Sequence, residues 1–487
     1  MGSQAAVQVT MQVSVTPMLS VAALARALGA KLILPNDMAV DALFSPQGDY
    51  LWVAGVSSDT RTIAVGDLFV AIVCENFNGN TYVEKAAARG AVAALVSEAQ
   101  ANATIAQIVV PNTKLALGLM AQLWRSRFSI PMIALTGSNG KTTVKEMLRT
   151  ILTAHYGNAA HVHATEGNLN NDIGLPLTLC KLRPAHRVAV LEMGMNHLGE
   201  INYLTRLAQP DIAIVNMAGT AHIGELGSVE AIAQAKGEIV TGLPSHGIAV
   251  LNADDRFFCY WKSLAGARRA VSFGLSNQAA DVCGERIANG LKISHAGASA
   301  VTQLQVAGEH NVRNALAATA AALALGVPLN TVAQGLAAFA GVAGRLRNFS
   351  GLQGSVVIDD SYNANADSMQ AAIKVLAAMP ANKHILVLGD MGEQGAKSVE
   401  MHRLVGTAAR AAGIEHLLLL GKASIETANG YGAGAKHFET LESLLAALQP
   451  LLTANTTVLV KGSRFMAMER VVAALVTDKN YSTKALH

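Results

Sequence analysis

The sequence predicts an α/β protein of three domains: a central parallel-sheet domain of the P-loop type, a C-terminal Rossmann-like domain and a smaller N-terminal α/β domain. Three observations lead to this prediction. Apolar blocks of strand length alternate with helical stretches through most of the 487 residues, which is typical of parallel sheets covered on both faces. A glycine-containing loop joins one apolar block directly to a helix. A second alternating series begins near Gly344.

Residues 1–111 form the predicted N-terminal domain. Short apolar runs alternate there with an amphipathic stretch, so we expect a helix over residues 81–89 and strands over residues 68–73, 91–96 and 108–110. The polar segment Ser57–Arg61 precedes these elements and is expected to be a loop.

Residues 112–343 form the predicted central domain. A helix over residues 114–127 leads into the apolar run 130–135, the glycine loop and a helix over residues 144–152. The following strands are expected over residues 188–191, 212–215 and 248–251, with helices over residues 201–207 and 229–241. Short β segments between residues 271 and 305 then precede an alanine-rich helix over residues 311–325.

Residues 344–487 form the predicted C-terminal domain, a small Rossmann-like sheet. Its expected strands cover residues 356–358, 385–388, 417–420 and 458–460. Its expected helices cover residues 368–378, 399–412, 441–448 and 466–476. No G-x-G-x-x-G motif follows any of these strands, so the sequence does not indicate a dinucleotide.

Composition narrows the possible classes of function. The net charge is +3 and the basic residues are dispersed, which excludes the basic stripe of a nucleic-acid-binding protein. Although 51% of the residues are hydrophobic, no apolar run approaches the roughly 20 residues of a membrane-spanning helix. The first basic residue is Arg26, so the cationic start of a signal peptide is missing. The four cysteines form no C-x-x-C pair, and a reducing cytoplasm is expected.

The glycine loop has the residues that bind phosphate. Its glycines allow backbone N–H groups to point at an anion, while the helix N-terminus and Lys141 add positive charge. Thr142 follows the lysine directly, where such loops bind Mg²⁺. Leu135 stands where the common motif has its first glycine, so this loop is shorter than in most P-loop kinases. The predicted ATP-binding residues of the loop are Thr136, Gly137, Ser138, Asn139, Gly140, Lys141, Thr142 and Thr143.

Two further polar residues follow neighbouring strands of the same predicted sheet. Glu192 follows the strand 188–191, and His222 lies in the segment after the strand 212–215. A carboxylate can bind Mg²⁺, which prefers oxygen ligands, and an imidazole can bind a metal or a phosphoryl group. A salt bridge for Glu192 and an ordinary loop position for His222 remain as alternatives.

An amide-rich loop lies ahead of Pro176. Asn168, Asn170 and Asn171 offer hydrogen-bond donors and acceptors that suit a polar substrate. Asparagines also build turns. The sequence leaves both roles open for this loop.

Polar segments also follow two strands of the third predicted domain, at the edge where α/β sheets bind ligands. The first contains Asp360, Tyr362, Asn363 and Asn365. The second contains Lys461, Ser463 and Arg464 and is expected to open a helix, so that helix N–H groups and two cations make an anion site. Lys236 differs, because it lies within a predicted helix, where an isolated lysine is normally a solvated charge.

Together these segments resemble the Mur ligase family. The resemblance runs in order from about Ser57 to Ala474, through TGSNGKTT, EGNLNNDIG, EMGMNHLGEI, HIGELGS with AKGEI, GEHNVRNALAA, GRL, DDSYNAN and VKGSR. It implies a UDP-sugar domain, a central ATPase domain and a C-terminal domain that closes over the nucleotide. It also implies ATP and Mg²⁺, with a peptide carboxylate converted to an acyl phosphate that an amine then attacks. DDSYNAN, and EMGMNH with AKGEI, favour the member that joins D-alanyl-D-alanine to a UDP-muramoyl-tripeptide.

The resemblance also implies roles for individual residues. The implied catalytic residues are Lys141, Glu192, His222 and Lys236, and the implied metal ligands are Thr142, Glu192, His222 and a carbamylated Lys236. The implied nucleotide contacts are Asn311 at the adenine and Arg345 and Asp360 at the phosphate and ribose. The implied UDP contacts are Ser58, Thr60 and Arg61. Two departures stand out: residues 74–80 read CENFNGN where the family typically has G-x-x-F-D-G-H, and Ala343 replaces a proline.

Two other functions remain possible from the sequence. A folylpolyglutamate-synthase-like or cyanophycin-type ligase would share the fold, but the S-x-T-R loop and DDSYNAN argue against it. A non-catalytic P-loop switch would bind ATP without making an amide, and Glu192, His222 and Asp360 argue against that. We expect a monomeric cytoplasmic enzyme with no nucleic-acid partner and no inserted membrane segment.

Overall fold

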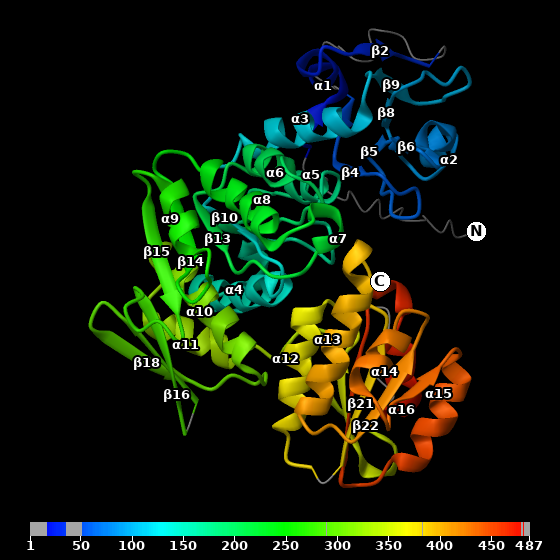
Figure 1. Ribbon diagram of the computed structural model, residues 1–487. Coiled ribbons are helices and arrows are strands. Elements are labelled where there is room, and N and C mark those ends of the chain that lie inside the picture. Colours follow the sequence, from blue (N-terminus) through cyan, green and yellow to red (C-terminus); the bar gives the residue numbers. More distant parts are fainter. Residues whose placement is uncertain (1–16, 36–50, 289, 382, 479–480, 482–487) are drawn as a thin grey trace, which may run out of the picture. The chain divides into compact units, whose positions relative to one another are not determined.

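The computed structural model describes residues 17–35, 51–288, 290–381, 383–478 and 481 (Figure 1). The chain folds into two compact units, each with many more contacts within itself than with the other. The first contains residues 1–128 and 176–182, and the second contains residues 129–175 and 183–487. The first unit therefore includes the helix Thr113–Arg125, which the sequence assigns to the central domain. Residues 1–16 and 36–50 of the predicted N-terminal domain lie outside the described ranges.

The first unit is built on a five-stranded sheet. In spatial order its strands are β2 (Lys31–Ile33), β9 (Ala106–Val109), β8 (Ala93–Val96), β5 (Asp67–Val70) and β4 (Gly55–Ser57), all parallel except β2. Its helices are α1 (Val21–Ala27), α2 (Val83–Ala88) and α3 (Thr113–Arg125). The predicted strand 68–73 ends early, because Val73–Cys74 (β6) pairs instead with Phe77–Asn78 (β7) in an exposed hairpin.

A nine-stranded sheet forms the centre of the second unit. In spatial order its strands are β11 (Val162–Ala164), β12 (Val188–Glu192), β10 (Met132–Thr136), β13 (Ile212–Val215), β14 (Ile248–Asn252), β15 (Arg269–Gly274), β16 (Val282–Ile287), β17 (Gly290–His295) and β18 (Ala298–Thr302). The strands from β11 to β16 are parallel, and β17 and β18 are antiparallel. Leu135 lies opposite Glu192, and Thr136 lies opposite Val215. The carboxyl ends of three strands therefore meet at one edge.

Helices cover both faces of the parallel part of this sheet, as the alternation of strands and helices predicts (Figure 1). On one face, Ile133 and Leu135 pack against α4 (Lys141–Tyr156) and α10 (Glu309–Ala324) in one buried core, joined by α11 (Leu329–Ala337). The other face carries α6 (Glu200–Ala208) and α8 (Val229–Thr241), with α9 (Phe258–Ala265) against β14 and β15. The short helix α7 (Ile223–Leu226) also belongs to this unit, whereas most of α5 (Gly174–Cys180) belongs to the first unit.

A six-stranded sheet follows in the same unit. In spatial order its strands are β19 (Arg347–Ser350), β20 (Val356–Asp360), β24 (Thr456–Lys461), β21 (Lys383–Gly389), β22 (His416–Leu420) and β23 (Lys436–Phe438), and only β19 is antiparallel. Its helices are α12 (Ala366–Ala377), α13 (Ser398–Ala411), α14 (Ile425–Tyr431), α15 (Leu441–Leu448) and α16 (Glu469–Leu475). Two hydrophobic cores fill its two faces, which confirms the Rossmann-like prediction.

One helix boundary differs from the prediction in a way that affects the site. Residues Arg464–Met466 form a 3-10 turn, Ala467 has a left-handed backbone (φ +47°), and α16 begins only at Glu469. The turn ends because a left-handed residue cannot continue a right-handed helix. The segment Lys461–Arg464 therefore opens one 3-10 turn rather than the longer helix that was expected.

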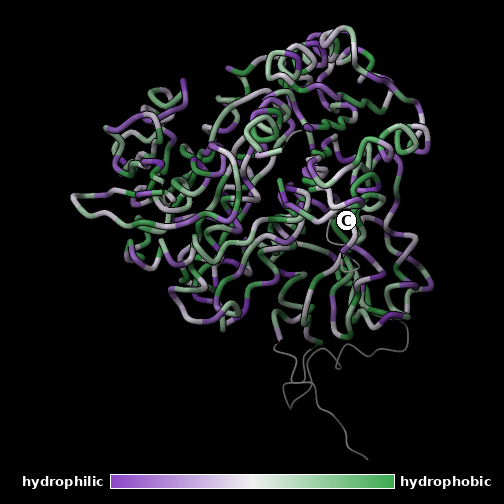
Figure 2. Tube along the Cα trace, turned by 90° about the horizontal axis from the view of Figure 1, so that it is seen from below, coloured by the Kyte–Doolittle hydropathy of each residue, from purple (hydrophilic) through white to green (hydrophobic). Residues whose placement is uncertain are grey.

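Hydrophobic and hydrophilic residues alternate in short blocks along the trace (Figure 2). Within the described ranges, no helix has both the length and the apolar character needed to cross a bilayer.

Candidate active site

The loop between β10 and α4 has the backbone of a phosphate-binding loop. Gly140 has a left-handed backbone (φ +84°) and precedes the first turn of α4. A Cβ atom on Gly140 would collide with the side-chain amides of Asn216 and Asn314, so only glycine fits there. Ser138 donates its N–H to the Met217 carbonyl at 3.0 Å. The N-terminus of a 16-residue helix therefore faces the loop, and its free N–H groups attract an anion.

Lys141 is the cation of this loop. Its Nζ atom donates a hydrogen bond to the Gly137 carbonyl at 2.8 Å and lies beside a cavity of about 450 Å³. Burial lowers the pKa of Lys141, and the negative charge of Glu192 partly opposes this change. The side chain is therefore placed to exchange one carbonyl for a phosphate oxygen.

Glu192 is a buried carboxylate held by neutral groups. Thr142 donates its hydroxyl to Oε2 at 3.1 Å, and Asn170 donates its amide to Oε1 at 2.8 Å. Glu192 is 3% exposed, and no residue in the described ranges forms an ion pair with its carboxylate. Because a buried carboxylate needs a counter-charge, this position is suited to a bound cation.

His222 lies in the segment between β13 and α7 and faces the same cavity. Its backbone is left-handed (φ +64°), which is uncommon for any residue other than glycine and is enriched at functional sites. Its Nδ1 atom lies 3.0 Å from Oε2 of Glu393. This contact lowers the pKa of Glu393 and keeps its carboxylate ionised.

The first cavity brings together most of the residues that the sequence singles out. They come from the phosphate loop, the amide-rich loop, the ends of β12 and β13, and the six-stranded part of the unit. The predicted residues that line it are Ser138, Asn139, Gly140, Lys141, Thr142, Asn168, Asn170, Asn171, Glu192, His222, Arg345, Tyr362, Asn363, Asn365 and Arg464. Arg345 also stacks over the Tyr362 ring, 4.3 Å from its centroid.

A second cavity of about 340 Å³ adjoins the other side of the phosphate loop. It shares Asn139, Gly140 and Arg345 with the first cavity. The other predicted residues that line it are Thr143, Asn311, Asp360 and Lys461. Its lining is more apolar, with Met217, Leu346 and Ala371 among its residues.

Four predicted residues of the second unit line neither cavity: Lys236, which is described below, and three that lie in the walls. Thr136 and Gly137 lead into the phosphate loop. Ser463 accepts the Gly392 N–H at 2.7 Å and donates to the Ala364 carbonyl at 3.1 Å. These residues fix the shape of the site.

The two cations of the C-terminal strand end do not form the expected anion site. Lys461 pairs with Asp360 at 2.7 Å and donates to the Asn363 carbonyl at 2.8 Å. Burial lowers the pKa of Lys461, and the Asp360 charge opposes this change. Arg464 binds the Glu469 carboxylate through both terminal nitrogens at 3.0 Å. Carboxylates of this chain therefore already pair with both cations, whereas the predicted anion site assumed that the two charges were free.

Lys236 is buried rather than solvated, which corrects the expectation from its helix alone. Lys236 is 1% exposed, and in the described part of the chain no hydrogen-bond or ion-pair partner of its Nζ atom is found. Burial lowers the pKa of Lys236 well below its ordinary value, and the nearby charge of Lys141 lowers it further. Ile232 and Val240, four residues before and after it, are buried on the same helix face. This spacing of four residues, visible in the sequence, indicates that Lys236 lies on the buried face of the helix.

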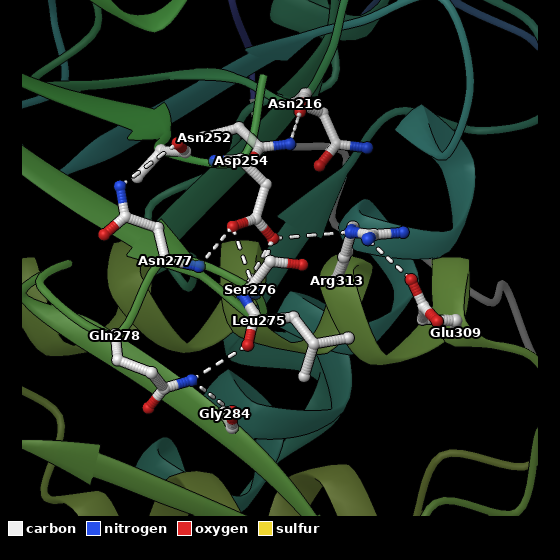
Figure 3. A network of polar contacts seen from close by, with 11 residues as sticks. Asn216, Asn252, Asp254, Leu275, Ser276, Asn277, Gln278, Gly284, Glu309 and Arg313 are labelled. Atoms are coloured by element: carbon white, nitrogen blue, oxygen red, sulfur yellow. Dashed lines mark hydrogen bonds and ion pairs between the residues drawn. The ribbon is translucent and has the colours of Figure 1, made fainter. Parts of the chain in front are cut away.

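The sequence analysis missed a polar network beside the second cavity (Figure 3). Asp254 follows β14 and accepts the backbone N–H groups of Leu275 and Asn277 at 2.8 and 2.7 Å. Arg313 of α10 lies 3.4 Å from the same carboxylate. Burial would raise the pKa of Asp254, but these hydrogen bonds outweigh it and lower the pKa. The signal that pointed to Glu192, a polar residue after a parallel strand, applies equally to Asp254.

The first unit carries the remaining predicted residues. Arg61 pairs with Asp59 at 2.6 Å and is exposed, whereas Thr60 is buried. The segment follows β4 at the carboxyl edge of the parallel part of its sheet. Ser58 lies in the same segment and is half-buried.

The chain is similar to proteins of known function in sequence and in fold. Residues 135–322 match the Mur ligase middle domain, and residues 344–464 match the Mur ligase glutamate ligase domain. The UDP-N-acetylmuramoyl-tripeptide–D-alanyl-D-alanine ligase of Escherichia coli is 42% identical over 442 residues, which cover 88% of this chain and 95% of that protein. A crystal structure of MurF from Acinetobacter baumannii has a TM-score of 0.84 and 34% identity, covering 95% of this chain and 99% of the other. The ADP complex of MurF ligase from Thermotoga maritima has a TM-score of 0.77 and 25% identity, with coverage of 86% and 96%.

Proposed function

This chain belongs to the Mur ligase family, and from that premise we propose that it joins D-alanyl-D-alanine to UDP-N-acetylmuramoyl-tripeptide at the expense of ATP. The product is the UDP-muramoyl-pentapeptide of peptidoglycan synthesis, with ADP and phosphate. One observation carries the proposal: a single cavity brings Lys141 and Glu192 together with His222 and with residues of the six-stranded sheet.

The reaction proceeds in two steps. A carboxylate oxygen of the tripeptide attacks the γ-phosphorus of ATP, ADP leaves, and an acyl phosphate forms. The amine of D-alanyl-D-alanine then attacks the acyl carbon, the C–O bond breaks, phosphate leaves and the amine loses a proton. Phosphoryl transfer mainly requires positioning and neutralisation of charge. No side-chain nucleophile is needed.

We assign the nucleotide and the peptide substrates to different parts of the two cavities. Lys141 and the N-terminus of α4 bind the phosphates, and His222 lies beside the transferring phosphoryl group. The second cavity takes the nucleoside, with Asn311 at the adenine and Arg345 and Asp360 at the phosphate and ribose. The amide-rich loop with Asn168, Asn170 and Asn171, and the C-terminal residues Tyr362, Asn363, Asn365, Ser463 and Arg464, orient the peptide substrates. The buried Lys461–Asp360 pair forms part of the wall of the second cavity.

The site also fits a magnesium ion. Glu192 is a buried carboxylate without a cationic partner, and Thr142 places a hydroxyl 3.1 Å from it. No cluster of three or more His, Cys, Asp or Glu side chains occurs in the residues that the structure describes. Mg²⁺ at nucleotide sites suits such a sparse set, since it uses few protein ligands together with water and phosphate oxygens. Thr142, Glu192 and His222 would hold it, and bound Mg²⁺ would neutralise charge on the β- and γ-phosphates.

Replacing Glu192 tests this assignment. Glu192→Ala is expected to raise the Mg²⁺ concentration for half-maximal ligation by about tenfold or more, because an anionic ligand is lost. The measurement is a Mg²⁺ titration of initial rate at saturating ATP. Glu442→Ala, which removes an exposed carboxylate of α15, is the matched control and should leave the titration unchanged. An identical Mg²⁺ dependence in Glu192→Ala would overturn the role of Glu192.

We propose that Lys236 is carbamylated and acts as a fourth metal ligand. Its burial without a partner favours the neutral amine, which is the form that attacks CO₂. An N–C bond then forms, the amine proton leaves to solvent, and a carboxylate results. Protein equilibrated with ¹³C-bicarbonate should show one carbamate carbon signal by NMR and one added CO₂ by native mass spectrometry, and Lys236→Ala should lose both. A plain lysine mass in the nucleotide-bound protein would contradict the proposal.

We further propose the domain roles and cellular setting. Residues 1–111 bind the UDP-sugar, with Ser58, Thr60 and Arg61 at the UDP; residues 112–343 bind ATP; and residues 344–487 close over the nucleotide. The separate sheets support this division. We also propose that the enzyme is a monomer. We place the enzyme in the cytoplasm, because its four cysteines are free, as in a reducing compartment.

The test of the function offers the purified chain UDP-muramoyl-tripeptide, D-alanyl-D-alanine and ATP with Mg²⁺. Mass spectrometry should detect the UDP-muramoyl-pentapeptide, with one ADP formed for each product. Folate with glutamate in place of the peptide substrates tests the folylpolyglutamate-synthase-like alternative and should give no product. ATP binding without amide formation from any substrate would favour the nucleotide switch instead.

A further inference from the structure

Side chains from three other elements hold the segment that leads to His222. Three consecutive backbone N–H groups, those of residues 218–220, each donate to a side-chain oxygen. The pairs are Ala218 with Asp255 at 3.0 Å, Gly219 with Ser138 at 2.9 Å and Thr220 with Asp367 at 2.6 Å. Ser138 belongs to the phosphate loop and Asp255 follows β14, but Asp367 belongs to α12 of the six-stranded sheet. The Thr220–Asp367 contact joins residues 147 positions apart.

The Asp367 contact is the shortest of the three. One carboxylate oxygen, Oδ2, accepts both the backbone N–H of Thr220 at 2.6 Å and its hydroxyl at 2.9 Å. Hydrogen bonds to an ionised acceptor are shorter and stronger than neutral ones. Thr220 is therefore fixed at both its main chain and its side chain, two residues before His222.

Asp367 is itself fixed by the start of α12. Asn365 caps this helix, accepting the Ser368 N–H at 2.9 Å while the Ser368 hydroxyl accepts the Asn365 N–H at 3.0 Å. The Asn365 amide also donates to the Asn139 side chain of the phosphate loop at 2.9 Å. The first turn of α12 is thus held against the phosphate loop, and Asp367 lies within that turn.

Two backbone features of the segment accompany this contact. A Cβ atom on Gly219 would collide with Oδ2 of Asp367, so glycine is needed for the carboxylate to approach. His222 has a left-handed backbone, which a non-glycine residue keeps only when its surroundings impose it. The contacts at residues 218–220 are the restraints next to it in the chain.

We propose that Asp367 is a positioning residue for His222. Its carboxylate fixes Thr220 and thereby keeps the His222 imidazole in the cavity with Lys141 and Glu192. The domain of the six-stranded sheet then contributes to phosphoryl transfer in two ways. Its own residues line the cavity, and Asp367 holds the loop that carries His222. The inference rests on the proposed function, in which His222 contacts the transferring phosphoryl group.

Asp367→Ala tests the inference by kinetics. It is expected to lower kcat for ligation by about 10- to 100-fold, because small displacements of a catalytic group have effects of this size. The KM for D-alanyl-D-alanine should stay within about twofold, since Asp367 lines the second cavity and not the first, where we place that substrate. Asp367→Asn keeps an oxygen that can accept from Thr220 and should recover most of the loss. Glu400→Ala removes an exposed acid from the first turn of α13 and is the matched control, with wild-type kcat expected.

A second measurement reads the His222 position directly. With ¹³C-labelled histidine, the His222 ring signal is identified by its loss in His222→Asn. Asp367→Ala should shift or broaden that signal and leave the signals of remote histidines unchanged, whereas Glu400→Ala should change none. Thr220→Val, which keeps the backbone contact and loses only the hydroxyl, should give a smaller shift and remains informative if Asp367→Ala folds poorly.

An unchanged His222 signal in a folded Asp367→Ala protein, or a kcat within twofold of wild type, would overturn the inference. A wild-type chain that forms no pentapeptide would instead contradict the proposed function. The two failures are distinguishable, because the NMR measurement does not depend on turnover.

Discussion

Lys141→Ala is expected to lower ligation at least about 10³-fold. Removing a charge that stabilises a transferring phosphoryl group typically costs this much or more. Lys141 stands at the first residue of α4 and its Nζ atom lies at the cavity that also contains Glu192. No other lysine lines that cavity among the described residues. Its loss therefore removes both phosphate binding and charge neutralisation.

Initial rates of pentapeptide formation measure the effect of Lys141→Ala. Lys422→Ala is the control, because Lys422 is exposed and lines neither cavity. Its rate should equal that of wild type. A Lys141→Ala rate within about tenfold of wild type would remove the phosphate-loop assignment.

Lys461→Ala is expected to lower the free energy of unfolding by about 3–5 kcal/mol, because it leaves a buried carboxylate without its partner. Lys461 and Asp360 lie 2.7 Å apart, with side chains 3% and 9% exposed. A single buried charge is unfavourable because it has lost its hydration, whereas the attraction between the two opposite charges offsets that cost. The double substitution Lys461→Met with Asp360→Leu removes both charges and should recover much of the loss.

Urea unfolding measures the stability of these variants. The exposed pair between Lys292 and Glu285, at 3.3 Å, supplies the control. Lys292→Ala should change stability by less than about 1 kcal/mol, because solvent screens the charges of an exposed pair. A Lys461→Ala loss no larger than that of Lys292→Ala would contradict the buried-pair interpretation.

The fold could be predicted from the sequence wherever a local pattern decides the structure. The apolar run before Thr136, the glycines and the helix beginning at Lys141 identify the phosphate loop, because the strand, turn and helix each have their own local signal. The alternation of strands and helices similarly predicted both parallel sheets. The positions of Glu192 and His222 at one sheet edge followed from that topology alone.

Residues whose environment depends on distant parts of the chain could not be placed in this way. Lys461 was expected to offer a free charge, but its partner Asp360 lies on the neighbouring strand, about a hundred residues away in sequence. The sequence did not indicate a role for Asp367, because its partner Thr220 lies in the loop after a strand of a different sheet. Lys236 was different, because the spacing of Ile232 and Val240 already indicated a buried face.

The fate of the carboxylate oxygens tests the central claim most directly. UDP-muramoyl-tripeptide labelled with ¹⁸O in its reacting carboxylate is incubated with the enzyme, ATP, Mg²⁺ and D-alanyl-D-alanine, and the released phosphate is analysed by mass. An acyl phosphate requires one ¹⁸O in each phosphate released, because the oxygen that attacked the γ-phosphorus leaves with it. Unlabelled phosphate alongside formation of the pentapeptide would contradict transfer of the γ-phosphoryl group to the peptide acid.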